Sequence, residues 1–213
     1  MEESVKLDEY IHNFSAQEDD LLADLRRQTN LKIRHPRMLS GIIQGKFLEM
    51  IASMINPKNV LEIGTYTGYS AICIARGLKD SAKLYTIEIN DELRDFAEVF
   101  FQNSGEASKI TQIVGDALEV IPKLDCVFDL VFIDGEKDEY CKYFNLIIEK
   151  LRPGGFILAD NVLWSGKVIQ EKIASNDYFT KGILEFNQMI KNDKRVENVI
   201  IPFRDGINII RKN

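Results

Sequence analysis

The segment Val60-Leu61-Glu62-Ile63-Gly64-Thr65-Tyr66-Thr67-Gly68-Tyr69-Ser70 decides the fold class of this chain. Its first four residues form a short, mostly apolar run, as in a strand that is covered on both faces. Residues 71–75 then carry apolar side chains at helical spacing. Gly64 and Gly68 lie at the junction, where the absence of a Cβ allows a sharp turn and a close ligand. We therefore predict a strand, a ligand-binding turn and a helix.

The glycine spacing indicates which ligands this turn suits. Dinucleotide-binding turns have G-x-G-x-x-G and phosphate loops have G-x-x-x-x-G-K-[ST], whereas this chain has Gly64-x-x-x-Gly68 with no lysine behind it. The free amides of the following helix can still face an anion such as a carboxylate. A nucleotide-binding module or an NAD-dependent enzyme is an alternative on the same kind of sheet, but the missing third glycine counts against both.

Length and composition indicate a soluble globular protein. The 213 residues, 45% apolar and 28% charged, fit a single domain 1–213 in which residues 1–56 form an amino-terminal helical extension. No uninterrupted apolar run is long enough to span a bilayer, and Met1-Glu2-Glu3-Ser4 lacks a secretory core. We expect a cytoplasmic protein without a membrane partner. The net charge of -6 disfavours nucleic acid as a partner without excluding it.

Cysteine and histidine are too few or too scattered for several kinds of site. Cys73, Cys126 and Cys141 are odd in number and lie in apolar surroundings, which favours reduced thiols over disulfides. His12 and His35 are the only histidines in the sequence. A histidine-based triad or a zinc site is therefore not expected.

Apolar periodicity predicts an α/β protein with a doubly wound, seven-stranded mixed sheet. Helices are expected at 4–14, 16–30 and 39–55, the last ended by Asn56-Pro57. The predicted strands are 59–63, 83–89, 110–114, 127–133 and 155–159, and the helices between them are 68–78, 91–103, 116–122 and 138–151. Asp91 is expected to cap the second of these helices, and residues 152–155 to end the fourth. Helix 177–192 precedes strands 196–201 and 206–211, whose short link forces an antiparallel carboxyl-terminal hairpin.

Acidic residues follow the strands on the side where the turn lies. In a doubly wound sheet, ligands bind beyond the carboxyl ends of the strands. Glu88 ends the second strand, 20 residues after Gly68, and is placed to accept both ribose hydroxyls of a nucleoside. Asp116 follows the third strand, where it can accept from an adenine amino group or cap the next helix. These residues predict a nucleoside-containing cofactor.

Two further strands end in oxygen ligands. Asp134 follows the fourth strand and Asp160-Asn161 the fifth, and neighbouring strands lie about 4.8 Å apart. Two carboxylates and a carboxamide suit Mg²⁺, with Mn²⁺ or Ca²⁺ as alternatives, although Asp160 can also cap a helix. Lys137 is a candidate base if a cation and partial burial lower its pKa. Taken alone, residues 136–139 are typical of a solvated turn.

The same residues carry a family resemblance. Glu62-x-Gly64-x-x-x-Gly68 resembles the first motif of class I S-adenosylmethionine-dependent methyltransferases. The segments 134–140 and 160–166, together with the closing Arg204-Asp205-Gly206, resemble the cation-dependent O-methyltransferases of the caffeoyl-CoA and catechol type. The matches run from about residue 36 to the carboxyl terminus.

The resemblance implies a set of roles. Asp134, Asp160 and Asn161 would bind Mg²⁺, which chelates adjacent oxygens of the acceptor, and Lys137 would be the base. Trp164 and Asp205 would line the acceptor pocket. The cofactor residues carried over from the family are Glu62, Gly64, Tyr66, Ser70, Glu88, Asp116, Ala117 and Asp134. A homodimer is also implied, with the amino-terminal helices as a candidate interface.

The resemblance predicts methyl transfer from S-adenosylmethionine to a hydroxyl of a catechol-like or hydroxycinnamoyl-type small molecule. This chain departs from the family pattern at Glu136, where many members have aspartate, and at Ser165, where a glycine is common. It also has no convincing match, near Lys6, for the lysine that plant members use toward coenzyme A. The alternative acceptor is 5-hydroxyuridine in tRNA, on which some bacterial relatives act.

Overall fold

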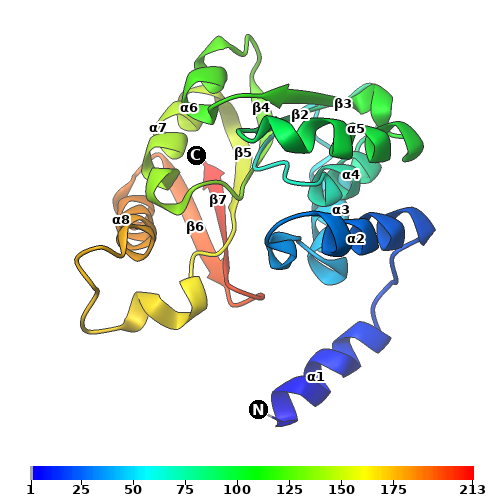
Figure 1. Ribbon diagram of the computed structural model, residues 1–213. Helices are drawn as coiled ribbons and strands as arrows, with labels where there is room; N and C mark the ends of the chain where they lie inside the picture. The colour runs from blue at the N-terminus through cyan, green and yellow to red at the C-terminus, as the bar shows by residue number, and fades with distance from the viewer. Residues whose placement is uncertain (1) are drawn as a thin grey trace.

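The computed structural model describes the backbone of residues 2–213 and the side chains of residues 6, 7 and 9–213, so Met1 of the expected domain lies outside the described residues. A seven-stranded sheet of order β3-β2-β1-β4-β5-β7-β6 forms its centre (Figure 1). β7 is antiparallel to both neighbours, and the other pairs are parallel. The strands are β1 Asn59–Ile63, β2 Lys83–Glu88, β3 Ile110–Val114, β4 Phe128–Ile133, β5 Leu151–Ala159, β6 Val196–Ile201 and β7 Ile207–Lys212. The predicted mixed sheet with a carboxyl-terminal hairpin is confirmed.

Helices connect the strands in the predicted order. The α-helices are α1 Glu2–Asn13, α2 Asp20–Lys32, α3 Ile42–Ile55, α4 Tyr69–Gly77, α5 Arg94–Asn103, α6 Ala117–Val120, α7 Tyr140–Lys150 and α8 Tyr178–Asn192. Short 3₁₀ turns are η1 Pro36–Met38, η2 Asp91–Leu93, η3 Ala107–Lys109, η4 Ile121–Lys123, η5 Lys137–Glu139 and η6 Trp164–Ile169.

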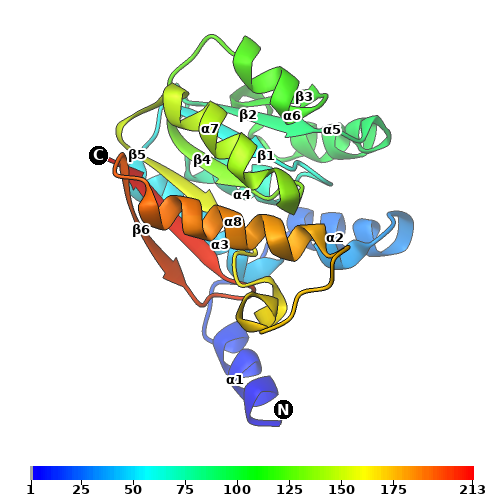
Figure 2. The ribbon, with the colours of Figure 1, turned by 90° about the vertical axis from the view of Figure 1, so that its left-hand side faces the viewer.

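The strands other than the edge strand β6 contribute to two hydrophobic cores, because successive side chains point to opposite faces of the sheet. Val60 and Phe132 pack with α3, α4 and α5, whereas Leu61 and Val131 pack with α7 and α8. Figures 1 and 2 show the two helical layers on opposite sides of the sheet. Both faces are therefore covered, as the apolar runs of the central strands predict.

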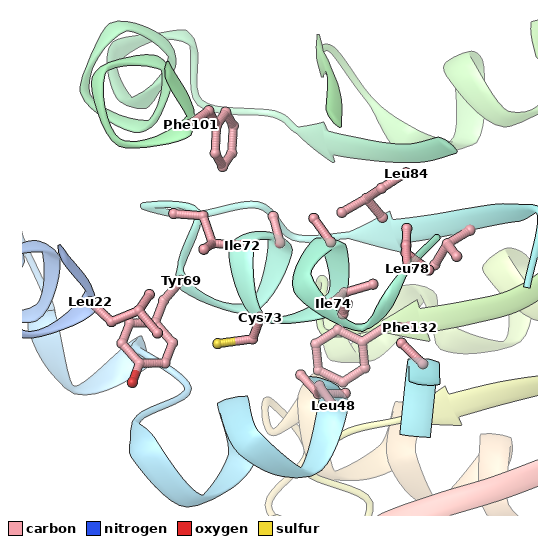
Figure 3. Close-up of a cluster of buried hydrophobic side chains, with 14 of the residues drawn as sticks. Leu22, Leu48, Tyr69, Ile72, Cys73, Ile74, Leu78, Leu84, Phe101 and Phe132 are labelled. Atoms are coloured by element: carbon pink, nitrogen blue, oxygen red, sulfur yellow. The ribbon is translucent and has the colours of Figure 1, made fainter. Parts of the chain in front are cut away.

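Helix α4 lies at the centre of the first core. Figure 3 shows Tyr69 of α4 beside Leu22 of α2, and Leu48 of α3 close to Phe132 of β4. Leu48 is 1% exposed, and its truncation to alanine is expected to cost about 2–5 kcal/mol. Because α4 begins at the glycine turn, packing of α2 and α3 against it holds the amino-terminal helices close to that turn.

Several predicted helix starts differ from the structure by two to four residues, and for the helix expected from residue 16 the reason is a local cap. The helix expected from residue 16 begins at Asp20, because the Asp19 carboxylate accepts from the Leu22 amide at 3.0 Å. The expected cap Asp91 does not cap α5: Asn90 caps the 3₁₀ turn η2, since its side chain accepts from the Glu92 amide at 3.1 Å, and α5 follows from Arg94 without a side-chain cap. Side-chain hydrogen bonds of this kind select one cap among several polar candidates.

Strand β5 also begins earlier than predicted. Residues 152–155 do not form a loop after a helix; α7 ends at Lys150 and β5 starts at Leu151. The pairing with β4 shifts register between Phe128 and Leu130. Such a bulge accommodates Pro153 and the glycines within a strand, because the missing donor of proline is not needed there.

One helical segment is long and apolar enough to span a bilayer, although no such segment was expected from the sequence. Pro36–Ile55, which contains η1 and α3, meets the length and hydropathy criteria of a membrane span at a mean hydropathy of 1.3. Gln44, Leu48 and Ala52 on its inner face are buried within the protein. That burial makes α3 a packed helix of this fold. Helix α1, in contrast, extends away from the rest of the chain in Figures 1 and 2.

Candidate active site

A cleft of 1560 Å³ runs along the carboxyl ends of the parallel strands. It is larger than the roughly 300–1,000 Å³ of a typical single-ligand pocket, so it has room for two ligands. Most of the predicted site residues line it: Gly64, Tyr66, Glu88, Asp116, Ala117, Asp134, Lys137, Asp160, Asn161, Trp164 and Asp205. Glu62 and Ser70 do not.

Gly64 brings the ends of β1 and β4 together. It has a φ of +99°, and a Cβ there would lie 2.3 Å from the Asp134 carbonyl oxygen. The Asp134 amide donates to the Ile63 carbonyl at 2.9 Å. No larger residue fits this approach, so the glycine places the proposed cofactor turn directly against Asp134.

Glu88 is fixed at the end of β2. Its Oε2 accepts from the Tyr66 amide at 2.7 Å, and its Oε1 accepts from the Asn90 amide at 3.0 Å. Tyr66 has a φ of +49°, a left-handed conformation that is uncommon for a bulky residue. The glutamate therefore links the glycine turn to the β2 end, and both face the cleft.

Glu62 lies behind the turn and not in the cleft. It is fully buried and accepts from the Thr86 hydroxyl. Burial raises the pKa of Glu62 to about 7, against the opposing effect of the Ser70 and Thr86 hydroxyls. Its buried Oε1 receives no hydrogen bond of good geometry from the part of the chain that the structure describes. Ser70 borders a small separate cavity beside Thr65 and Tyr66.

Asp116 occupies the position that both of its predicted roles require. Its carboxylate accepts from the Leu118 amide at 2.8 Å and caps α6. The same residue lines the cleft at the β3 end, next to the buried Ala117. The cap leaves Asp116 in place beside the cleft, so the two roles are compatible.

Asp134 and Asp160 follow paired residues of neighbouring strands, since Ile133 pairs with Ala159. Asp160 is 4% exposed, and its Oδ1 accepts from the Asn161 amide at 2.8 Å. Burial, together with the charge of Asp134, raises the pKa of Asp160 to about 6. The two carboxylates are thus close enough to repel each other.

Asn161 supplies the third oxygen donor at this point of the cleft, from a backbone with a φ of +58°. Among the described side chains, those of residues 6, 7 and 9–213, no three from His, Cys, Asp and Glu gather in a metal-binding group. A cation at Asp134 and Asp160 would therefore depend on the Asn161 carboxamide or on water as a further ligand.

Lys137 is held tightly in place. Its Nζ donates to Asp134 Oδ1 at 2.8 Å and to the Tyr140 hydroxyl at 2.9 Å. Burial lowers the pKa of Lys137, but the Asp134 carboxylate and the Tyr140 hydroxyl outweigh it, and the net shift is upward. The predicted fall of this pKa depends on a cation beside the lysine; without one, the ion pair with Asp134 keeps the pKa of Lys137 raised.

Sequence reasoning missed Gln44 and Arg204. Gln44 is 1% exposed, and its Nε2 donates to Asp160 Oδ2 at 2.6 Å. Arg204 donates to Gln44 Oε1 and to the Ser40 carbonyl oxygen. Helix α3 and the β6–β7 link therefore meet at Asp160. No local pattern signals this contact, because 116 residues separate Gln44 from Asp160.

The end of the cleft where an acceptor pocket was predicted has a strained turn. Trp164 and Ser165 have φ values of +45° and +53°. The Asp205 carboxylate accepts from the Ser165 amide, and the Trp164 ring packs edge-on against Phe179 with centroids 6.1 Å apart. Asp205 thus holds the turn that presents Trp164, and strain of this kind is common at binding sites.

Comparison with known proteins agrees with this geometry. A family model described as O-methyltransferase matches residues 12–213. The chain belongs to the O-methyltransferase family. It is 33% identical over 207 residues to caffeoyl-CoA O-methyltransferase 5 of Nicotiana tabacum, covering 92% of this chain and 85% of that protein. Caffeoyl-CoA O-methyltransferase 1 of Eucalyptus globulus is 34% identical over 206 residues, with coverages of 92% and 82%.

Solved structures of O-methyltransferases share the fold closely. TomG of Streptomyces achromogenes, in complex with SAM, has a TM-score of 0.91 and 29% identity, covering 98% of this chain and 96% of that chain. The enzyme from Bacillus cereus, in complex with SAH, has a TM-score of 0.90 and 28% identity, with coverages of 98% and 97%. The prediction of an S-adenosylmethionine-dependent O-methyltransferase is confirmed at the level of the family, and a dehydrogenase is not supported.

Proposed function

We propose that this chain transfers the methyl group of S-adenosylmethionine to a hydroxyl of a catechol-like or hydroxycinnamoyl-type small molecule, with the help of a divalent cation. The observation that carries the proposal is the meeting of Asp134, Asp160, Asn161 and Lys137 in one cleft beside the glycine turn. The relatives named caffeoyl-CoA O-methyltransferase support this acceptor class.

The cofactor would lie at the β1 and β2 ends. Glu88 presents a fixed carboxylate for ribose hydroxyls, and Asp116 lies at the β3 end for the base. The cofactor contains no phosphate, so a turn without a lysine suits it, and its sulfonium charge suits an acidic cleft.

The residues present fit a hard divalent cation. Asp134 and Asp160 are close, like-charged and largely shielded from solvent, so a cation would relieve their repulsion. With Asn161 they form an all-oxygen donor set that suits Mg²⁺, Mn²⁺ or Ca²⁺. When bound, such an ion would act as a Lewis acid that stabilises the oxyanion of the acceptor.

The protein's own residues orient the acceptor and remove the proton of its hydroxyl. One S–C bond breaks and one O–C bond forms, so the acceptor oxygen must be placed behind the methyl carbon at about 3 Å. Tyr140 and Asp134 hold Lys137 Nζ at the cleft wall. We assign the hydroxyl proton to this nitrogen in its neutral form, which would become accessible if Asp134 turned from the lysine to a bound cation. Trp164 would cover the ring of the acceptor. No covalent enzyme intermediate is required.

The direct test is incubation with labelled S-adenosylmethionine and a panel of phenols, with and without Mg²⁺. We expect methylation of vicinal diols in the presence of the cation, little methylation of monophenols, and loss of turnover in EDTA. Equal turnover of diols and monophenols, or full activity in EDTA, would contradict the chelation of adjacent oxygens. Equilibrium dialysis with S-adenosylmethionine and NAD tests the cofactor separately.

A further inference from the structure

The connector between α2 and α3 carries a cluster of basic side chains that the proposed chemistry does not use. Lys32, Arg34, His35 and Arg37 all line the cleft, and all four are exposed to solvent. Within the described part of the chain, Lys32, Arg34 and Arg37 make no ion pair and no side-chain hydrogen bond. Three cations within six residues of a chain with net charge -6 are thus free to bind a ligand.

Other cations of the same cleft are already engaged. Lys137 is paired with Asp134, and Arg204 donates to Ser40 and Gln44. The strand ends contribute carboxylates, among them Glu88 and Asp116. The cleft therefore has an acidic floor and a basic rim, and the available positive charge lies on the connector.

The backbone of the connector is fixed, although its basic side chains are exposed. The Tyr66 hydroxyl donates to the Arg34 carbonyl oxygen at 3.0 Å, and Arg204 donates to that of Ser40. His35 has a φ of +58°, and Pro36 follows it. These contacts hold the backbone of the connector beside the cleft, so that less backbone entropy is lost when its exposed side chains bind a ligand.

We propose that Arg34 and Arg37 bind an anionic substituent of the acceptor, a carboxylate or a phosphate ester, while the ring hydroxyls lie at Asp134 and Lys137. The inference rests on the proposed function and narrows its substrate class to catechol-type rings with an acidic side chain. Guanidinium groups suit this role because their paired donors match carboxylate and phosphate oxygens. The carboxylate of the cofactor offers the same chemistry, so the test must separate the two.

The test compares acceptors that differ in charge. Methylation of 3,4-dihydroxybenzoate, a phosphorylated catechol, neutral catechol and an aminoethyl catechol is measured for the unmodified protein and for Arg34→Glu/Arg37→Glu. Lys79→Glu/Lys191→Glu is the matched control, because it makes the same change of charge at exposed positions outside the cleft. If Arg34→Glu/Arg37→Glu does not fold, the neutral double variant Arg34→Gln/Arg37→Gln is measured in its place.

We expect kcat/KM for the anionic acceptors to exceed that for neutral catechol by about 10-fold at low salt. The Arg34/Arg37 variants should lose this advantage, keep the rate with neutral catechol within about 3-fold, and bind the cofactor unchanged by calorimetry. Added salt should reduce the advantage in the unmodified protein. The control variant should retain it.

Several outcomes would overturn the inference. Equal kcat/KM for anionic and neutral acceptors, or an equal loss for all acceptors in the variants, would show that the connector does not recognise an acidic group. Weaker cofactor binding would assign the arginines to the cofactor carboxylate. Retention of tRNA that is lost in the variants, without discrimination among catechols, would assign them to RNA.

The inference and the proposed function can fail separately. Turnover of neutral catechol with Mg²⁺ tests the proposed function and does not involve the rim. Binding of 3,4-dihydroxybenzoate and of catechol, followed by saturation-transfer NMR, tests the rim without turnover. Preferential binding of the acid that disappears in Arg34→Gln/Arg37→Gln supports the inference, and equal binding of both compounds contradicts it.

Discussion

At the floor of the cleft, Asp160 and Lys137 are buried and held by hydrogen bonds, whereas at its rim Arg34 and Arg37 are exposed and only their backbone is held. Groups that take part in chemistry need fixed positions, since small displacements reduce the rate. Groups that attract a charged substituent tolerate mobility, because attraction between charges varies slowly with distance. The difference teaches that mutations at the floor should change the rate of reaction, and mutations at the rim the choice of acceptor.

The largest expected effect is at Asp160. Asp160→Ala should lower cation-dependent turnover by about 10³-fold or more while changing the affinity for S-adenosylmethionine by no more than about 3-fold. The reason is that the carboxylate faces Asp134 and Asn161 and not the glycine turn. Turnover with and without Mg²⁺, and calorimetry with the cofactor, measure the two effects. Asp193→Ala, distant from the cleft and paired with Arg195, is the control.

The next effect is at Lys137. Lys137→Ala should lower kcat about 100-fold with little change in cofactor affinity, because a positioned proton acceptor is lost. Since a base must be deprotonated, and Asp134 holds the Lys137 pKa upward, the unmodified rate should rise with pH between 6 and 9. Lys137→Arg, which keeps the charge but cannot release a proton, is the control. The same rate across this pH range for the unmodified protein and for Lys137→Ala would refute a base role.

A third prediction concerns Glu62, which is buried behind the glycine turn, and its effect on the stability of the folded protein. The pKa of Glu62 is about 7 in the folded protein, against an ordinary value of 4.5, so between these values the folded state holds a proton that the unfolded state has lost. Stability therefore falls as pH rises from about 5 to 7. Glu62→Gln should remove this fall and gain roughly 1–3 kcal/mol over the unmodified protein at pH 8. Chemical unfolding at pH 5 and pH 8, with exposed Glu171→Gln as control, measures it.

The smallest of these effects is expected at Gln44, which holds Asp160 without being a proposed ligand. Gln44→Ala should weaken Mn²⁺ binding about 10-fold, in the range seen when a partner of a metal ligand is removed. Electron paramagnetic resonance of Mn²⁺ gives the affinity without turnover. Gln112→Ala is a matched control, because the Gln112 side chain is without a hydrogen-bond partner in the described chain. Unchanged Mn²⁺ affinity in Gln44→Ala would show that Asp160 does not need this contact.

The alternation of strands and helices was predictable because it depends on local periodicity. The bounds of β1, β3 and β6 agree with the predicted strands residue for residue. The early start of β5 was not predictable from Pro153 and the following glycines, since these residues usually end an element. Its pairing with β4 provides the bulge that accepts them.

Some residues of the candidate site were likewise predictable from local sequence, and others were not. Glu88, Asp116, Asp134 and Asp160 follow predicted strands, and parallel strands bring their carboxyl ends to one edge. Glu62 lies on β1 itself, so its side chain points into the interior and not into the cleft. Gln44 belongs to a segment without a motif, and Arg204 was noted only as part of the closing Arg204-Asp205-Gly206 segment; packing places Gln44 against Asp160 and Arg204 against Gln44.

The sequence by itself determined the sheet, the glycine turn and the acids that follow the strands, because each depends on neighbours within a few residues. Only the tertiary structure decided that Lys137 is ion-paired, that Gln44 orients Asp160, and that the basic connector borders the cleft. The contact of Gln44 with Asp160 joins residues 116 positions apart, whereas the ion pair of Lys137 with Asp134 is local in sequence but depends on how far both groups are buried. Their energies depend on burial and distance, which exist only after the sheet and its helices have packed.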